Sequence, residues 1–175
     1  MSEIKVYKKL EWLNNLPVDE AERVFADCCG SRSWARQMAA ARPFPMLEHL
    51  FKHAGQIWRS LAAADWLEAF AAHPKIGSAK PAPVQHKRAA DWSAGEQSGL
   101  ADAAEDVRRK LAEANELYER RFGFIFIVCA TGKSAGEMLA ICEERLKNSA
   151  ADEIANAAAE QQKITEIRLA KLLER

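Results

Sequence analysis

Only one stretch of this sequence has the composition of a β-strand, and a single strand cannot form a sheet. The stretch is FGFIFIVCATG, an unbroken run of β-branched and aromatic residues around Gly123 and before Gly132. It indicates either a buried extended segment or the start of a buried helix. Because helical periodicity dominates the rest of the chain, we expect an all-α fold.

Apolar residues recur at helical spacing through most of the chain. The segment Val18–Cys29, for example, puts Ala21 and Phe25 on one face and has acidic residues in its first turn. Further helices are predicted over residues 33–38, 46–61, 65–72, 93–122, 138–148 and 151–173. Ser33 is expected to cap the first of these, and Ser134 and Glu137 have capping-box spacing before residues 138–148. Residues 78–90 contain two prolines and no apolar stripe, and we expect them to form a loop. We therefore expect one compact domain over residues 1–175, with about seven to nine helices and one short extended buried segment.

Charge and composition favour a small-molecule partner. Lys plus Arg and Asp plus Glu each number 25, so no net field attracts nucleic acid or an anionic membrane. No apolar run reaches the roughly 20 residues of a membrane span. The polar start MSEIKVYKKL and the final LLER show no targeting signal, and the four cysteines lack paired C-x-x-C spacing. We expect reduced thiols and a cytoplasmic protein.

His73 is the first candidate for chemistry. It follows a predicted helix in the sequence HPKIG, where Pro74 disfavours helix at His73 and Gly77 permits a tight turn. Such a turn can hold an imidazole rigidly, and imidazole exchanges protons near neutral pH. A histidine at this place can also simply cap the end of its helix, and these residues leave both interpretations open.

Glu96 and Gln97 lie in the sequence WSAGEQSG. Ser93 and Glu96 have the spacing of a capping box, so Ser93 is expected to begin the long helix that runs to Phe122. A capping role alone would explain Glu96. The functional alternative is a carboxylate that orients or charges a histidine, with Gln97 offering a donor and an acceptor to an amide-like substrate edge.

The run from Gly123 to Gly132 and the side chain of Arg168 are further candidates. The simplest role of the run is core packing. If it is extended, its backbone amides and carbonyls need partners, which a flat heterocycle rich in urea groups can supply. Arg168 lies at helical spacing from Ile164 and Leu172, so its side chain need not face solvent.

Metal and phosphate chemistry are less well supported. His49 and His53 have a spacing that can ligate a metal, and a metal-dependent hydrolase that uses them would need His73 or His86 as a further ligand. The intervening residues lack the glutamate of H-E-x-x-H, and no third ligand is evident. Lys133 in ATGKS lacks the first glycine of a phosphate-binding loop. We expect no metal and no cofactor.

Taken in order, four motifs resemble one enzyme family. They are HPKIG, the pattern S-x-x-E-Q at residues 93–97, FGFIFIVCATG and QQKITEIRLAKLL, and the N-terminal FADCCGSRSWARQMAAARPF also fits bacterial members. Over nearly its whole length the chain is similar to the 2-oxo-4-hydroxy-4-carboxy-5-ureidoimidazoline (OHCU) decarboxylases. These enzymes complete the conversion of urate to (S)-allantoin. The resemblance implies an all-α homodimer that needs no metal or organic cofactor.

The resemblance also implies roles for individual residues. His73 is expected to be the catalytic proton donor, Glu96 the carboxylate that partners it, and Arg168 the cation of the substrate site. The other substrate contacts implied are Pro74, Ser93, Gln97, Phe126, Ile127, Val128, Cys129 and Ala130. The expected reaction is a carboxy-lyase reaction with stereospecific protonation, in which a carbon–nitrogen double bond of the ureide substrate accepts the electron pair.

Two other functions fit the same residues. The chain could be a helical interaction module whose HPKIG and ATGK turns are purely structural. It could also be a relative that kept the fold and acts on another ureide or carboxylated heterocycle, since the site motifs would survive that change. Ligand-dependent stabilisation would argue against the first, and a substrate screen would identify the second.

Overall fold

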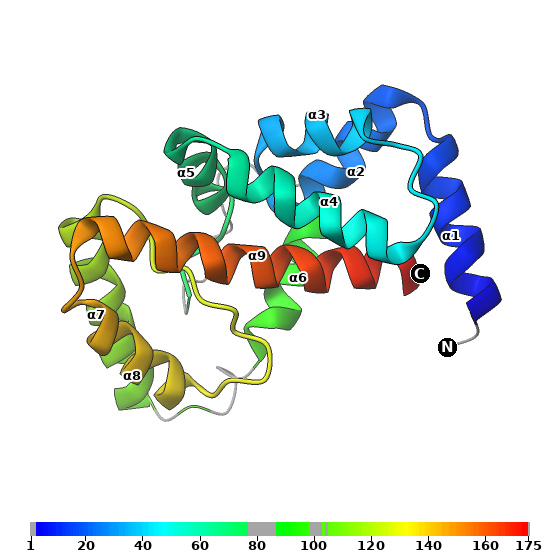
Figure 1. Cartoon of the computed structure of the whole chain (residues 1–175). Helices are drawn as coiled ribbons and strands as arrows, with labels where there is room; N and C mark the ends of the chain where they lie inside the picture. The colour runs from blue at the N-terminus through cyan, green and yellow to red at the C-terminus, as the bar shows by residue number, and fades with distance from the viewer. Residues whose placement is uncertain (1–2, 77–86, 99–102, 104, 175) are drawn as a thin grey trace. The chain divides into compact units, whose positions relative to one another are not determined.

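The structure is a computed structural model that describes residues 3–76, 87–98, 103 and 105–174. Within these ranges the chain forms nine α-helices and no strand (Figure 1). The helices are α1 (Glu3–Asn15), α2 (Val18–Cys29), α3 (Arg32–Ala40), α4 (Leu47–Ser60), α5 (Ala63–Ala71), α6 (Lys87–Glu96), α7 (Glu105–Phe122), α8 (Ala135–Arg145) and α9 (Ala150–Glu174). The all-α prediction is confirmed. None of the described helices is long and apolar enough to cross a membrane.

The chain groups into two compact units. The first comprises Met1–Ala69 together with Gln162–Arg175, and the second comprises Phe70–Gln161. Helix α9 therefore begins in the second unit and ends in the first.

The first unit packs α2 against α3 and α3 against α4 (Figure 1). The ring of Phe25 meets Trp34 and Phe44 edge-on, with centroids 5.9 and 6.4 Å apart, a favourable aromatic geometry. The Trp34 indole donates to the carbonyl of Ala54 at 3.1 Å and so ties α3 to α4. The predicted helix Val18–Cys29 is confirmed, and Gly30 ends it in the left-handed conformation with φ 84°.

Two local predictions in this unit change. The cap of α3 is Ser31 rather than Ser33, because the Ser31 hydroxyl accepts the Trp34 N–H at 3.3 Å. A further helix, α1, precedes the predicted ones. Its buried stripe is short, since Leu10 and Leu13 are 3% and 0% exposed whereas most of its other described side chains face solvent, and a short stripe gives a weak periodic signal.

The second unit packs α7 against α8. Tyr118 lies at the centre of an aromatic group, with ring centroids 4.7 Å from Phe122, 5.8 Å from Phe124 and 5.2 Å from Phe126. The core around it comprises Ile76, Leu111, Ala114, Tyr118, Phe126, Val128, Ala130, Ala135, Met138 and Cys142. The predicted capping box before α8 is confirmed, with Ser134 and Glu137 bonded reciprocally.

The predicted single helix over residues 93–122 is wrong. α6 ends at Glu96, α7 begins at Glu105, and Ala103 between them belongs to neither helix. Ser93 therefore lies in the last turn of α6 and does not cap a helix start. Residues 87–90, predicted to be loop, are the first turn of α6. Residues 78–86 of the predicted loop lie outside the described residues, as do residues 99–102 and 104 of the predicted helix.

The buried face of α6 explains why the helix begins early. Ala89, Trp92 and Ser93 are 7%, 4% and 3% exposed and have the spacing i, i+3 and i+4 of one helix face. The glycines at positions 95 and 99 disfavour continuation, since each glycine inside a helix costs about 1 kcal/mol relative to alanine.

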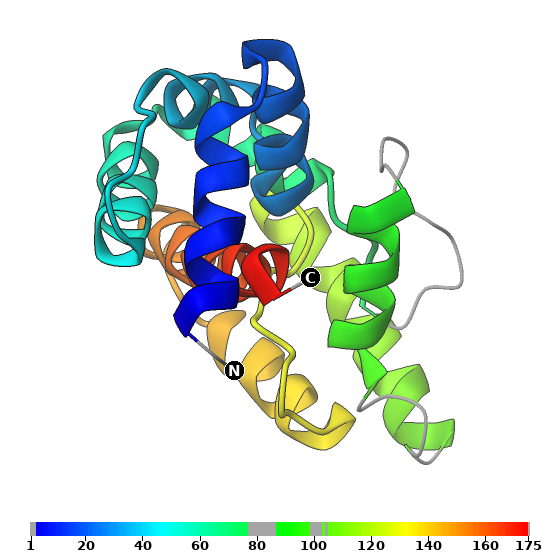
Figure 2. The same ribbon diagram turned by 90° about the vertical axis from the view of Figure 1, so that its right-hand side faces the viewer.

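The segment between α7 and α8 contains the strand-like run. Figures 1 and 2 draw it as an open path without helical turns. Residues 126–130 are between 2% and 7% exposed and belong to no helix, so the prediction of a buried non-helical segment is confirmed. The side chains of Phe126, Val128 and Ala130 enter the core around Tyr118. This alternation is the period of an extended chain.

Candidate active site

His73 follows the end of α5, with only Ala72 between them, which agrees with the predicted position at a helix end. It is partly buried, and its backbone N–H donates to the carbonyl of Phe70 at 3.1 Å. α5 ends at Ala71 because Pro74 disfavours the helical conformation at the residue before it. The imidazole is thus presented from a turn instead of a helix side.

Two contacts hold this turn to α7. Lys75 forms an ion pair with Glu119 at 2.5 Å, and the side-chain amide of Asn115 donates to the carbonyl of Ile76 at 3.3 Å. The Ile76 side chain is 7% exposed and belongs to the core of the second unit. The exposed ion pair contributes little energy, whereas the buried bond from Asn115 fixes the backbone after His73.

Ser93, Glu96 and Gln97 lie at the end of α6. Ser93 is 3% exposed, Glu96 is the last helical residue, and the N–H of Gln97 donates to the Ser93 carbonyl at 3.2 Å. Ser93 does not cap a helix, so capping does not explain why its side chain is buried. Glu96 and Gln97 are both partly buried, so the three side chains occupy a half-covered helix end.

Several charged groups act on the thiol of Cys129. Burial raises the pKa of the Cys129 thiol, Lys133 lowers it, and the carboxylates of Glu160 and Glu96 raise it further. The charge of Glu96 therefore affects the pKa of Cys129, which belongs to the segment over residues 126–130 that was predicted to contact the substrate. Lys133 and Glu160 are additions to the predicted set.

Two charged side chains hold the backbone of Cys129 itself. Its N–H donates to the Glu160 carboxylate at 2.8 Å, and its carbonyl accepts from the Lys133 ammonium at 2.7 Å. The backbone N–H of Cys129, which the sequence placed among the substrate contacts, thus has a protein partner.

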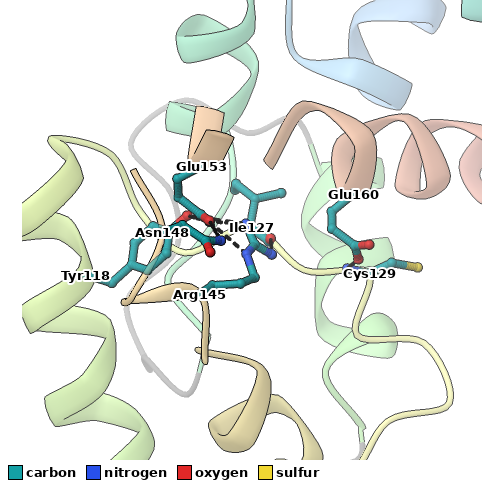
Figure 3. A network of polar contacts seen from close by, with 7 residues as sticks. All are labelled: Tyr118, Ile127, Cys129, Arg145, Asn148, Glu153 and Glu160. Atoms are coloured by element: carbon teal, nitrogen blue, oxygen red, sulfur yellow. Dashed lines mark hydrogen bonds and ion pairs between the residues drawn. The ribbon is translucent and has the colours of Figure 1, made fainter. Parts of the chain in front are cut away.

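A buried ion pair also holds the segment. Arg145 donates to the carbonyl of Ile127 at 2.7 Å and pairs with Glu153 at 2.5 Å (Figure 3). Glu153 also accepts from the hydroxyl of Tyr118 and from the side-chain amide of Asn148 at 2.8 Å. Burial, followed by the hydrogen bond to Glu153, raises the pKa of Tyr118, which keeps the phenol protonated.

Sequence reasoning missed Arg145, although a signal was present. Met138, Cys142 and Arg145 have the spacing i, i+4 and i+7 of one buried helix face. A charged residue at such a position has to find a buried partner.

Arg168 lies on α9 and is 2% exposed, so the prediction that it need not face solvent is confirmed. It belongs to the first unit, whereas His73 and Glu96 belong to the second. Its charge lowers the pKa of Cys29, but burial has the larger effect and raises that pKa to about 12.

The histidines of the metal alternative have other contacts. His53 Nδ1 lies 2.7 Å from the carbonyl of His49, and its ring packs against Phe44. Among the described residues, no group of three or more His, Cys, Asp or Glu side chains could hold a metal ion. His86 lies outside those residues.

Comparison with known proteins identifies the family. The family model for OHCU decarboxylase matches residues 14–170. This chain belongs to the OHCU decarboxylase family. A crystal structure of OHCU decarboxylase in the presence of (S)-allantoin is 39% identical, with a TM-score of 0.75, and covers 86% of this chain and 97% of that chain.

Curated relatives agree with this family. The uric acid degradation bifunctional protein TTL of Arabidopsis thaliana is 44% identical over 147 residues, which are 83% of this chain and 45% of that protein. The OHCU decarboxylase of Haloferax volcanii is 24% identical over 93% of this chain and 94% of its own length. The chain spans less than half the length of the first two curated relatives it matches, both bifunctional proteins.

Proposed function

We propose that this chain is a carboxy-lyase that converts OHCU to (S)-allantoin. Two kinds of observation support the proposal. The chain belongs to the OHCU decarboxylase family, and its His73 lies on a turn that Asn115 anchors to α7. The anchored turn supports the proposed mechanism, because proton transfer requires a donor held in a fixed position.

The substrate itself supplies the electron sink. One ring carbon carries a carboxylate and a hydroxyl, and it adjoins a carbon–nitrogen double bond. When its bond to the carboxylate breaks, carbon dioxide leaves and the electron pair forms a double bond between the two ring carbons. The electrons of the former carbon–nitrogen double bond move to the ring nitrogen, which takes up a proton, and the result is an enol. The hydroxyl proton is then lost, a proton adds to the neighbouring carbon, and the product carbonyl forms. This sequence needs no external electron acceptor.

We assign the proton steps to His73 and Glu96. His73 acts at the substrate hydroxyl and delivers a proton to one face of the ring, and Glu96 is the carboxylate that orients and polarises the imidazole. Delivery to one face makes the product a single enantiomer. Arg168 binds the substrate carboxylate by charge.

Substrate binding completes the proposed site. The contacts are Pro74, Ser93, Gln97 and the segment Phe126–Ala130. Within the segment, Val128 is 5% exposed, and its backbone makes no hydrogen bond to any part of the chain that the structure describes. The segment therefore offers the Val128 N–H and C=O to a urea-like edge, which has one acceptor and one donor.

A coupled assay tests this function. Urate oxidase and the hydrolase that follows it generate the unstable substrate, and circular dichroism follows the handedness of the allantoin formed. We expect wild-type protein to give fast decay to one enantiomer, and His73→Asn to give slow racemic decay like the reaction without enzyme. His49→Asn, a histidine outside the proposed site, is the matched control. Wild-type decay no faster than the blank refutes the proposal.

The same assay separates the alternatives. An interaction module would give no catalysis and no thermal stabilisation by allantoin. A relative with another substrate would be stabilised by related carboxylated ureides and would turn one of them over. A loss of activity on addition of a chelator would instead favour a metal-dependent reaction.

We further propose that the protein acts as one domain, as a homodimer, and in the cytoplasm. The family model spans both compact units, which supports a single functional domain. All four cysteines are free and buried, which suits a reducing compartment. Analytical ultracentrifugation tests the dimer, and cell fractionation tests the location.

A further inference from the structure

The segment over residues 126–130 poses a problem of backbone hydrogen bonding. It is buried, but it is neither helical nor paired with a strand in the described part of the chain. Buried peptide groups nevertheless need partners. In this segment, charged side chains supply them, and we call Arg145, Lys133 and Glu160 the backbone clamp.

The clamp reaches the segment from different elements. Arg145 of α8 donates to the Ile127 carbonyl at 2.7 Å, and Glu160 of α9 accepts the Cys129 N–H at 2.8 Å (Figure 3). Lys133 donates to the Cys129 carbonyl at 2.7 Å. Each contact joins a full charge to a peptide group, the stronger class of hydrogen bond.

Peptide geometry makes these contacts directional. In a trans peptide the C=O and the N–H of one planar unit point in opposite directions. The Ile127 carbonyl shares its plane with the Val128 N–H, so Arg145 turns that N–H away from itself. The Cys129 N–H shares its plane with the Val128 carbonyl, so Glu160 turns that carbonyl away in the same manner.

The clamp therefore fixes both polar backbone groups of Val128. The Val128 side chain is already committed to the core, and each flanking peptide plane is held by a charged side chain. A donor and an acceptor on one extended residue point to the same edge of the chain. Such a pair complements the N–H and C=O of a cyclic urea or amide.

Arg145 is itself held in place before any ligand arrives. Its guanidinium pairs with Glu153 at 2.5 Å and donates to the Tyr118 hydroxyl at 3.2 Å. A donor fixed by its own partners loses little freedom when the substrate binds, which favours affinity.

We propose that Glu160 and Arg145 are positioning residues that aim the Val128 peptide groups at the ureide ring. The inference rests on the proposed function, because it assigns a purpose to the segment that contacts the substrate. Neither side chain needs to touch the substrate. Glu160 is the better residue to test, since removing Arg145 would leave the buried Glu153 carboxylate uncompensated and could prevent folding.

The experiment compares Glu160→Ala, Glu160→Gln and wild type in the coupled assay, with Glu116→Ala on the exposed side of α7 as the matched control. We expect Glu160→Ala to raise KM by about tenfold, the factor that corresponds to about 1.4 kcal/mol. Glu160→Gln keeps an oxygen that can accept the Cys129 N–H, so its KM should stay near the wild-type value. Amide hydrogen exchange should be faster at Cys129 in Glu160→Ala alone.

Three outcomes would overturn different parts of this proposal. A wild-type KM in Glu160→Ala, or an equal defect in Glu160→Gln, overturns the positioning role. An unchanged Cys129 exchange rate in Glu160→Ala overturns the clamp itself. A wild-type protein that leaves substrate decay uncatalysed overturns the proposed function and the role in binding together, and the wild-type arm alone reports that failure.

Discussion

Removal of Glu153 should destabilise the protein more than removal of any exposed acid. Its side chain is fully buried, and it accepts hydrogen bonds from Arg145, Tyr118 and Asn148. Glu153→Leu would leave the Arg145 guanidinium, 11% exposed, without its counter-charge. Breaking a buried ion pair in this way costs about 3–5 kcal/mol.

The loss of the ion pair should also lower Tm, and a second substitution at Arg145 should restore part of the lost stability. For a chain of this length each kcal/mol lowers Tm by about 2–4 °C, so Glu153→Leu should lose about 6–20 °C. Arg145→Met alone should cost a similar amount, since it leaves a buried carboxylate. The double variant removes both charges. Relative to Glu153→Leu it adds only the Ile127 carbonyl as a group without its donor, at about 1–3 kcal/mol, since the Tyr118 hydroxyl and the Asn148 amide have already lost Glu153 in that variant. It should therefore be more stable than Glu153→Leu.

Urea unfolding followed by circular dichroism measures these free energies. Glu144→Leu is the matched control, because Glu144 pairs with Lys147 on the surface with both side chains more than 70% exposed. That exposed pair should contribute less than about 1 kcal/mol. The reasoning is refuted if both single variants lose less than about 1 kcal/mol, or if the double variant loses the sum of the two.

Other predictions follow from the caps, thiols and turn anchors. Ser134→Ala should lower the free energy of unfolding by about 1 kcal/mol in urea titrations. Hydrogen bonds from Ser134 lower the pKa of Glu137, so its contribution should be lost as pH falls through the carboxyl range, which acid titration of stability checks. Burial raises the pKa of Cys29 and Cys142 to about 12, so a thiol reagent should not label them in the folded state. Stability should also fall above about pH 8.5, where only the unfolded thiols lose their protons. Asn115→Ala should cost about 1 kcal/mol and lower kcat more than it raises KM, since it loosens the turn that carries His73, the proposed proton donor.

Sequence patterns predicted the helix ends that depend on neighbouring residues in the chain. The helix Val18–Cys29 and the capping box at Ser134 follow from residues within one or two turns. The same capping pattern at Ser93 misled, because serine and glutamate three residues apart also occur inside a helix. There the burial of Ala89 and Trp92 decided where the helix lies, and burial is a tertiary property.

The candidate site divides in the same way. The turn at His73 and the buried run around Val128 were predictable, because proline, glycine and β-branched residues constrain the backbone directly. Glu160 and Arg145 were not predicted, because an acid or a base on a helix is normally a solvated surface group. Only its position on a buried helix face distinguishes Arg145, and only the fold shows which peptide group it meets.

The division of the chain into units has a consequence for synthesis on the ribosome. The first unit begins the chain, yet it also contains Gln162–Arg175. The second unit, Phe70–Gln161, is contiguous and is translated in full before that last segment. Domains usually fold in the order of their translation, but here the unit that starts first has to wait for the end of α9. We therefore expect nascent chains to acquire their first stable structure in the middle of the sequence, with the N-terminal helices as the segment most dependent on chaperones.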